Sequence, residues 1–350
     1  MQTHSLNHEG LNLFSDLLDT PSPSGHEAAM AAVLTTKLTQ MDYCPELDAA
    51  GNLLVRIEGQ DASRPTLCFA AHMDEIGMTI TQIYADGSLG VDRLGGLLPW
   101  KLGEKPIMII GDDAQIQGAF SLGSGHSKSV VQAGPSWTSA RIITALSPEA
   151  LADQGIRVGA SAVPARAVRG PFVFGSDASP WVSAWTFDNR LAIVAVLQAL
   201  QELKEKQIQP QSSLLIAFTV EEEIGCLGAK VLAQRERPDL FIAIDGSPLV
   251  PECAIALDGR PGIRSRDRLA TYDQELLREI CQLSTTTGID LQPVVYAGAA
   301  SDASAVYAVG AAPRIACLGY VRASSHGCEI TPLSTFDQLR ATVSTLFQRL

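Results

Sequence analysis

The sequence predicts an α/β fold in which a mostly parallel sheet is sandwiched by helices and a small β domain is inserted into the chain. Apolar segments typical of strands alternate with segments typical of helices near the N-terminus and again after residue 188. This alternation favours a parallel sheet with both faces covered. The chain has 350 residues, 46% of them hydrophobic, which is enough for one large core and a second, smaller one.

The insert is indicated by a change of pattern between residues 78 and 174. Short alternating runs there are separated by turn pairs such as Asp86-Gly87, which are typical of antiparallel hairpins. One clear helix begins with Ser147-Pro148, a capping residue followed by proline at the first helical position. We therefore expect a discontinuous α/β domain and a β-barrel-like insert, with these bounds: 1–76 and 176–350 for the former, 77–175 for the latter.

Within the α/β part, apolar runs of strand length alternate with longer segments of helical length. Before the insert we expect one helix and two strands. After it we expect a helix, two strands, a second helix and a last strand. In chain order these elements are predicted at 25–40, 52–57 and 65–71, and then at 189–204, 213–220, 240–244, 274–284 and 314–318.

Composition excludes two classes of partner. The formal net charge is -12 and the pI about 4.9, so the overall field repels nucleic acid and anionic membranes. The longest apolar stretches, 28–34 and 191–197, are far shorter than the roughly 20 residues of a membrane-spanning helix. The first ten residues carry no leader signal, and the seven cysteines form no CxxC pair. We interpret these cysteines as reduced core residues and expect a cytoplasmic protein.

Several predicted strands end in residue types that bind metals. Ligands bind open α/β sheets beyond the carboxyl ends of the strands. Four such residues follow strands and a fifth precedes the helix at 189–204: His72, Glu223, Asp245 and His326, and before the helix Asp188. Taken singly, each has a simpler explanation, such as a helix N-cap for an aspartate. Because all five converge on one edge of the sheet, we predict a metal site there.

Two histidines and three carboxylates suit two borderline divalent metals, zinc or cobalt with manganese as an alternative, better than magnesium or calcium. If one carboxylate bridges the metals, each metal has one histidine and one further carboxylate. Asp74 stands two residues after His72. It can accept the second ring N–H of that histidine, which fixes the tautomer.

The run Glu221-Glu222-Glu223 follows a largely apolar strand, and three carboxylates there would repel one another unless cations were present. A solvated acidic edge is the alternative. With Glu223 as a ligand, the spare Glu222 is placed to accept a proton from the attacking water. We therefore predict that Glu222 is the general base.

The sequence with these residues resembles the M42 family of metallo-aminopeptidases, the group of glutamyl and tetrahedral aminopeptidases. The similarity covers nearly the whole chain. It is found in Ser24-Gly25-His26-Glu27, Gly51-Asn52-Leu53, Ala71-His72-Met73-Asp74-Glu75-Ile76-Gly77, Leu94-Gly95-Gly96, Phe187-Asp188-Asn189-Arg190, Glu222-Glu223-Ile224-Gly225, Ala243-Ile244-Asp245, Ser301-Asp302-Ala303 and His326.

The resemblance implies a role for each site residue. His72 and Asp245 would bind one metal, Glu223 and His326 the other, and Asp188 would bridge them. Glu222 matches the catalytic base of the family. The resemblance also implies the fold of dinuclear zinc peptidases with an inserted β domain, short peptides as substrates, and self-association into a tetrahedral dodecamer.

The chain departs from the family pattern at two places. Gly327-Cys328 follows His326 where the family often has Ser-Pro, and Glu221 stands where glutamine is common. An extra charge at Glu221 would raise metal affinity or favour a basic N-terminal residue in the substrate, unless the side chain faces solvent. Cys328 is a candidate soft ligand with a core residue as the alternative. His126, in a Gly/Ser-rich loop of the insert, is either a surface residue or a group that reaches a neighbouring subunit's site.

Three other functions compete with an aminopeptidase. A deacylase or carboxypeptidase would use the same five ligands but would recognise its substrate through an arginine. A catalytically silent scaffold would keep the fold, although the sequence retains all the predicted site residues. A glycosidase also uses paired acids, but its chemistry does not need His72 and His326.

Overall fold

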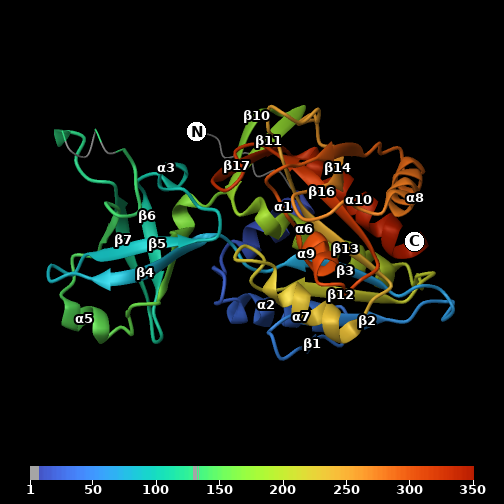
Figure 1. Cartoon of the computed structure of the whole chain (residues 1–350), viewed down its shortest axis with the longest axis horizontal. Coiled ribbons are helices and arrows are strands. Elements are labelled where there is room, and N and C mark those ends of the chain that lie inside the picture. Colours follow the sequence, from blue (N-terminus) through green and yellow to red (C-terminus); the bar gives the residue numbers. More distant parts are fainter. Residues whose placement is uncertain (1–7, 129–131, 133) are drawn as a thin grey trace.

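Two lobes make up the protein in the computed structural model, which describes residues 8–128, 132 and 134–350 (Figure 1). The larger lobe contains a mixed sheet with helices packed against it, and the smaller lobe is a barrel formed by the middle of the chain. Residues 1–7, part of the segment searched for a leader signal, lie outside the described residues.

The large lobe is organised by a sheet that, within the described residues, has eight strands in the order β1-β2-β12-β3-β13-β16-β14-β15. The central strands β12, β3, β13 and β16 are parallel, whereas β2 and β14 run antiparallel to their inner neighbours. Strands β3 and β12 are buried along their whole length, as expected for central parallel strands. The bounds are Glu46–Leu47 (β1), Leu53–Ile57 (β2), Leu67–His72 (β3), Leu214–Thr219 (β12), Leu240–Pro248 (β13), Pro261–Arg266 (β14), Gln292–Val295 (β15) and Arg314–Arg322 (β16).

The register of the central strands brings their carboxyl ends to one level. His72 at the end of β3 pairs with Thr219 at the end of β12, so the glutamates that follow β12 lie beside it. Strand β13 pairs with β3 at Ala243 and Ala70, which places Asp245, two residues further on, level with His72. The edge of the sheet therefore collects the side chains that follow these strands.

Helices pack on the sheet and on one another. Helix α6 is buried along most of its length and contacts α1, α10, β3 and β13, while α7 packs against α9, which lies on β13 and β16. Asp273 caps α8 by accepting a hydrogen bond from the Leu276 N–H, a common N-cap arrangement. The helices span Glu9–Leu17 (α1), Ala28–Gln40 (α2), Phe187–Glu205 (α6), Leu227–Glu236 (α7), Gln274–Thr285 (α8), Asp302–Ala308 (α9) and Ser334–Arg349 (α10).

The small lobe is a closed barrel with the strand order β4-β5-β8-β7-β6-β9. Its own core is separate from that of the large lobe and includes Met78, Ile80, Val91 and Ile109. The predicted helix is α5, which Ser147 caps by accepting a hydrogen bond from the Ala150 N–H. The bounds are Gly77–Ile83 (β4), Leu89–Leu94 (β5), Pro99–Leu102 (α3), Pro106–Ile110 (β6), Gln115–Ser121 (β7), Arg141–Ile143 (β8), Pro148–Ala152 (α5), Ser161–Pro164 (β9) and the 3₁₀ helix Arg166–Val168 (η1).

A small antiparallel sheet of β10 (Phe172–Ser176), β11 (Ser179–Trp185) and β17 (Cys328–Pro332) lies where the chain passes from the barrel into α6. Trp185 pairs with Cys328. Because β11 ends just before Asp188 and β17 begins just after His326, this pairing brings two predicted ligands from distant parts of the chain to one place.

The predicted fold class is confirmed, including the inserted β domain. The division at residues 76 and 175 stays a prediction. Strands β13 and β16 each extend four residues beyond their predicted ends, because polar residues such as Asp245 and Ser247 interrupt the apolar run but continue the ladder. Among the described residues, every helix is too short or too polar to traverse a bilayer. The core interpretation holds for Cys68, Cys226 and Cys317 but is wrong for Cys44 and Cys328, which are exposed.

Candidate metal centre

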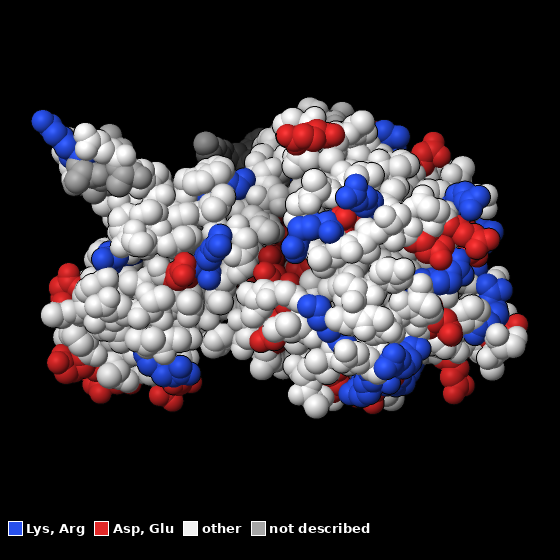
Figure 2. Space-filling view, viewed as in Figure 1, with Lys and Arg blue, Asp and Glu red and all other residues white. Residues whose placement is uncertain are grey.

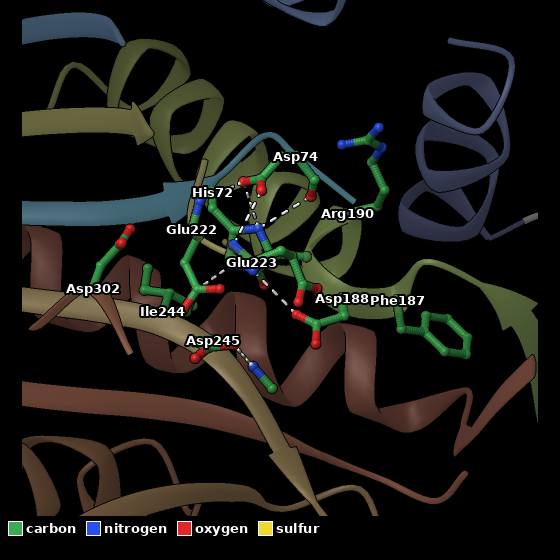
Figure 3. Close-up of polar contacts among 12 residues, drawn as sticks. His72, Asp74, Phe187, Asp188, Arg190, Glu222, Glu223, Ile244, Asp245 and Asp302 are labelled. Carbon is green, nitrogen blue, oxygen red and sulfur yellow. Dashed lines mark hydrogen bonds and ion pairs between the residues drawn. The ribbon is translucent and has the colours of Figure 1, made fainter. Parts of the chain in front are cut away.

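Four of the five predicted ligands surround one point at the carboxyl edge of the sheet. Ligand atoms of His72, Asp188 and Glu223 all lie within 4.8 Å of one another, and Figure 3 shows these side chains facing each other. Nε2 of His326 lies 3.6 Å from both Asp188 Oδ2 and Glu223 Oε2. Donor atoms at zinc-ligand distance are roughly 3.4 Å apart in a tetrahedral site, so this spacing suits a metal ion.

Asp188 lies between the two histidines. Its Oδ1 is 3.2 Å from Nε2 of His72, and its Oδ2 is 3.6 Å from Nε2 of His326. Asp188 and Asn189 have non-helical backbone angles, so the helical part of α6 begins only after them. The Asp188 N–H donates to Glu329 Oε2 at 3.0 Å, which holds this junction in place.

Asp74 is buried and organises the turn that carries the glutamates. Its carboxylate accepts hydrogen bonds from the N–H groups of Glu222 at 3.0 Å and Glu223 at 3.1 Å, and from the Ser24 hydroxyl at 2.6 Å. Asp74 Oδ1 also lies 3.3 Å from Nδ1 of His72. One buried carboxylate thus orients both a histidine and the glutamate turn.

Asp245 lines the same cavity but lies outside the cluster of His72, Asp188 and Glu223. Its Oδ2 accepts a hydrogen bond from Arg264 Nη2 at 2.8 Å, and its Oδ1 accepts one from the Gly246 N–H at 2.5 Å. The structure therefore brings four predicted ligands together and places the fifth against a buried arginine.

A second buried arginine lies at the site, and sequence reasoning missed both. Arg322, at the end of β16, donates to Asp188 Oδ2, and its Nε donates to Glu329 Oε1 at 2.5 Å. Burial opposes ionisation of Asp188, but Arg322 and the two histidines outweigh it and hold the pKa of Asp188 well below its usual range. The strand-end rule that found His72 applies equally to Arg322, because it follows the apolar run of β16.

The remaining charges of the site shift pKa values in the opposite direction. Burial, with repulsion from neighbouring carboxylates, holds the pKa of Glu222 well above its usual range and raises that of Glu223 to about 7. The carboxylate of Glu223 raises the pKa of His326 to about 10. A second buried acid, Asp302, lies within 4.8 Å of Glu222 and Cys226, and burial raises its pKa to about 6.

These residues fit divalent cations. Glu223 Oε1 is buried and has no hydrogen-bond partner among the described residues, although buried carboxylate oxygens are normally satisfied. Imidazole and carboxylate donors together suit zinc, cobalt or manganese. Acidic side chains lie at the bottom of the hollow between the lobes, with basic ones on its rim (Figure 2), and the cavity there has a volume of about 450 Å³.

The chain matches the family model described as M42 glutamyl aminopeptidase over residues 51–341. It belongs to this family. A glutamyl aminopeptidase of Lactococcus lactis subsp. cremoris is 29% identical over 256 residues, which cover 66% of this chain and 65% of the relative. A lysyl aminopeptidase of Pyrococcus furiosus is 28% identical over 241 residues, which cover 67% and 65%. The chain thus matches just under two thirds of the length of each relative.

The same architecture occurs in a solved structure. The Pyrococcus horikoshii TET1 peptidase, described as assembling into a tetrahedron or a large octahedral shell, superposes with a TM-score of 0.86 at 24% identity, covering 97% of this chain and 100% of that one. At this identity the likeness shows the fold of the M42 protein and nothing finer.

Three residues singled out in the sequence lie away from the ligand cluster of this M42 chain. Glu221 stands on the other side of the turn, where its N–H donates to Glu27 Oε1 at 3.1 Å. Cys328 is exposed, with its sulfur 3.1 Å from the Ser183 hydroxyl. His126 is exposed on the barrel. The ligand, specificity and subunit-contact roles suggested for them stay predictions.

Gly96 of the barrel lobe leaves no room for a side chain beside the His326 ring, because a Cβ atom there would overlap Nδ1 and Cε1. We expect Gly96→Ala to displace His326 and lower kcat/KM at least about tenfold, with weaker metal retention. Metal content after dialysis, together with kcat/KM, measures the effect. Gly125→Ala, which meets nothing within 4 Å, is the matched control. Equal behaviour of the two variants would show that the His326 loop adapts freely.

Glu27 is buried beside Asp74, and burial first, then the charge of Asp74, raises its pKa to about 7. A folded-state pKa above the ordinary 4.5 means that stability is lost as the pH rises from about 4.5 to about 7. Glu27→Gln keeps the acceptor for the Glu221 N–H and stays neutral. In the presence of a chelator, the unfolding free energy of Glu27→Gln should exceed that of the wild type by under about 1 kcal/mol at pH 5 and by about 3 kcal/mol at pH 8. Denaturant titrations at both pH values test this, and a pH-independent difference would contradict it.

Proposed function

We propose that this protein is a two-metal aminopeptidase that removes residues from the N-termini of short peptides. The observation that carries the proposal is the clustering of His72, Asp188 and Glu223 within 4.8 Å, with His326 facing the same point. Membership of the M42 family supports the reaction class. The relatives' activities toward glutamyl and lysyl termini differ, so the family does not fix the preferred residue.

We assign His72 and Asp245 to one metal, Glu223 and His326 to the other, and Asp188 as the bridge. The two oxygens of Asp188 face different histidines, at 3.2 and 3.6 Å, which suits a bridging carboxylate. Asp74 would keep His72 in the tautomer that presents Nε2 to a metal. Zinc or cobalt suits this donor set, with manganese as an alternative.

When bound, a pair of divalent cations polarises the scissile carbonyl and lowers the pKa of water. The chain itself supplies the base. Glu222 is held by the Asp74 hydrogen bond to its backbone and stands next to, not within, the ligand cluster. Its raised pKa suits acceptance of the proton from water and its delivery to the leaving amine. The negative charge of the buried Asp302 beside it contributes to the raised pKa of Glu222.

Self-association into a tetrahedral dodecamer is part of the proposal, supported by the tetrahedron that is one of two assemblies described for the TET1 peptidase and by a dodecameric PhTET1-12s structure. An enclosed set of active sites would restrict substrates to short peptides. A cytoplasmic location and the domain boundaries at 76 and 175 stay predictions of the sequence.

One observation favours a carboxypeptidase or deacylase as the second candidate. Arg268 lines the site cavity, is exposed, and its guanidinium pairs with no described residue. A free guanidinium suits a substrate carboxylate, which an exopeptidase acting at the C-terminus must bind.

A pair of blocked peptides distinguishes these functions. The first peptide has a free N-terminus and an amidated C-terminus, and the second has an acetylated N-terminus and a free C-terminus. An aminopeptidase cleaves only the first, loses activity in chelator and regains it with zinc or cobalt. Cleavage of the second alone would establish the carboxypeptidase or deacylase, and no hydrolysis of either after metal addition, with both glutamyl and lysyl N-termini in the first peptide, would favour a silent scaffold.

A further inference from the structure

Arg264 is a buried cation fixed beside one of the two proposed metal positions. It lies on β14 and is 2% exposed. Its Nη2 donates to Asp245 Oδ2 at 2.8 Å and to the Gly246 carbonyl at 2.5 Å, and its Nη1 donates to the Ala300 carbonyl at 2.7 Å. The guanidinium also lies 5.5 Å from the centre of the Tyr296 ring.

Most of these contacts do not depend on Asp245. Two backbone carbonyls from different segments and an aromatic ring hold the guanidinium, so it stays in place whichever other charge Asp245 meets. Among the described residues, Asp245 is the one carboxylate paired with Arg264. The positive charge of Arg264 is therefore directed at that single proposed ligand.

The arginine at the other end of the site is balanced differently. Arg322 contacts the bridging Asp188, but its Nε donates to Glu329, which is 1% exposed. The extra carboxylate of Glu329 compensates the charge of Arg322. Glu223 and His326 have no arginine partner among the described residues, and Glu223 Oε1 is unsatisfied.

We infer that Arg264 makes the two metal positions unequal, so that the position of Glu223 and His326 fills first and the position of His72 and Asp245 fills second and more weakly. Arg264 acts as a positioning residue through Asp245. Without metal it is the counter-ion that keeps Asp245 buried and oriented. With metal it opposes the second cation by direct repulsion. This inference rests on the two-metal site of the proposed function.

The test is the stepwise metal affinity of the whole, chelator-treated protein. Zinc is titrated calorimetrically, cobalt is followed by its absorption spectrum, and metal content is counted after dialysis at buffered free metal. We expect the wild type to bind two ions per chain with dissociation constants at least about tenfold apart. Arg264→Met should bring the weaker constant about tenfold or more toward the tighter one, and Arg264→Lys should keep the wild-type difference.

Two further measurements separate this role from a structural one. Arg266→Met removes an exposed arginine two residues away on the same strand and should leave both constants unchanged. In the metal-free form, Arg264→Met should lower the melting temperature, because Asp245 loses its counter-ion. A variant that is less stable without metal yet binds the second ion more tightly cannot be explained by general misfolding.

The outcomes separate the inference from the proposed function. If the two dissociation constants differ in Arg264→Met as much as in the wild type, or more, the inference is overturned while the aminopeptidase stands. Fewer than two ions per chain in the wild type overturns both. The third outcome is a protein that binds two ions with unequal dissociation constants, which Arg264→Met makes more similar, but that hydrolyses neither blocked peptide. This outcome supports the inference and overturns the aminopeptidase.

Discussion

Replacing Glu222 with glutamine is expected to lower kcat about 10³-fold while two metal ions per chain are retained. Glutamine keeps the volume and one carbonyl oxygen of the side chain but cannot accept a proton from water. The backbone N–H of residue 222 still donates to Asp74, so the turn that carries Glu223 keeps its shape. The measurements are kcat on an aminoacyl-p-nitroanilide and metal content by elemental analysis.

Glu221→Gln is the matched control, because the two glutamates are adjacent and equal in charge. Glu221 lies on the Glu27 side of the turn, so its replacement should change kcat only a few-fold. Retention of a tenth of the wild-type kcat in Glu222→Gln would exclude Glu222 as the base. Loss of one metal ion in that variant would instead show that Glu222 is a ligand.

The sequence was most informative where a residue with a metal-binding side chain follows an apolar strand. His72, Glu223 and Asp245 come directly after strands or extend them, and parallel strands with matched register deliver such residues to one edge. A pattern of this kind is local and can be recognised without knowing the strand order. The ligand and base assignments themselves stay predictions.

The partners of the site's arginines could not be identified in the same way. Arg264 and Arg322 are each 2% exposed, although arginine is rarely buried unless it is paired. Their partners, Asp245 and Asp188, lie 19 and 134 residues away in the sequence. Nothing in a local pattern indicates which of the acids at the sheet edge a given arginine meets.

Pairing over long distances also hid part of the fold. Strand β17 pairs with β11 about 145 residues earlier, and the antiparallel strand β14 interrupts the parallel order beside β16. These strands are short, and their neighbours are set by the path of the whole chain. The sequence therefore indicated the central parallel strands but not the sheet that brings Asp188 and His326 together.

Replacing Glu75 with glutamine is expected to cost about 3–5 kcal/mol of unfolding free energy, the largest stability effect that the structure indicates. Glu75 is fully buried where the chain enters the barrel, and it accepts hydrogen bonds from Arg169 Nη2 at 2.6 and 2.7 Å. Arg190 of α6 lies 3.5 Å away, and burial lowers the pKa of Arg190 to about 10 even with Glu75 beside it. Glutamine would take the contacting carboxylate away from two buried guanidinium groups and turn an N–H donor toward them.

The effect is measured by denaturant unfolding at pH 7 in chelator, so that metal binding does not mask it. The control is Asp112→Asn, which breaks the pair with Arg157 on the barrel surface, where both side chains are more than half exposed. An exposed pair contributes about 0–1 kcal/mol. Glu75 lies at the entry to the barrel, Arg169 at the exit from it, and Arg190 on α6. A loss of unfolding free energy no larger than that of the control would mean that the junction between the lobes does not depend on the Glu75 carboxylate.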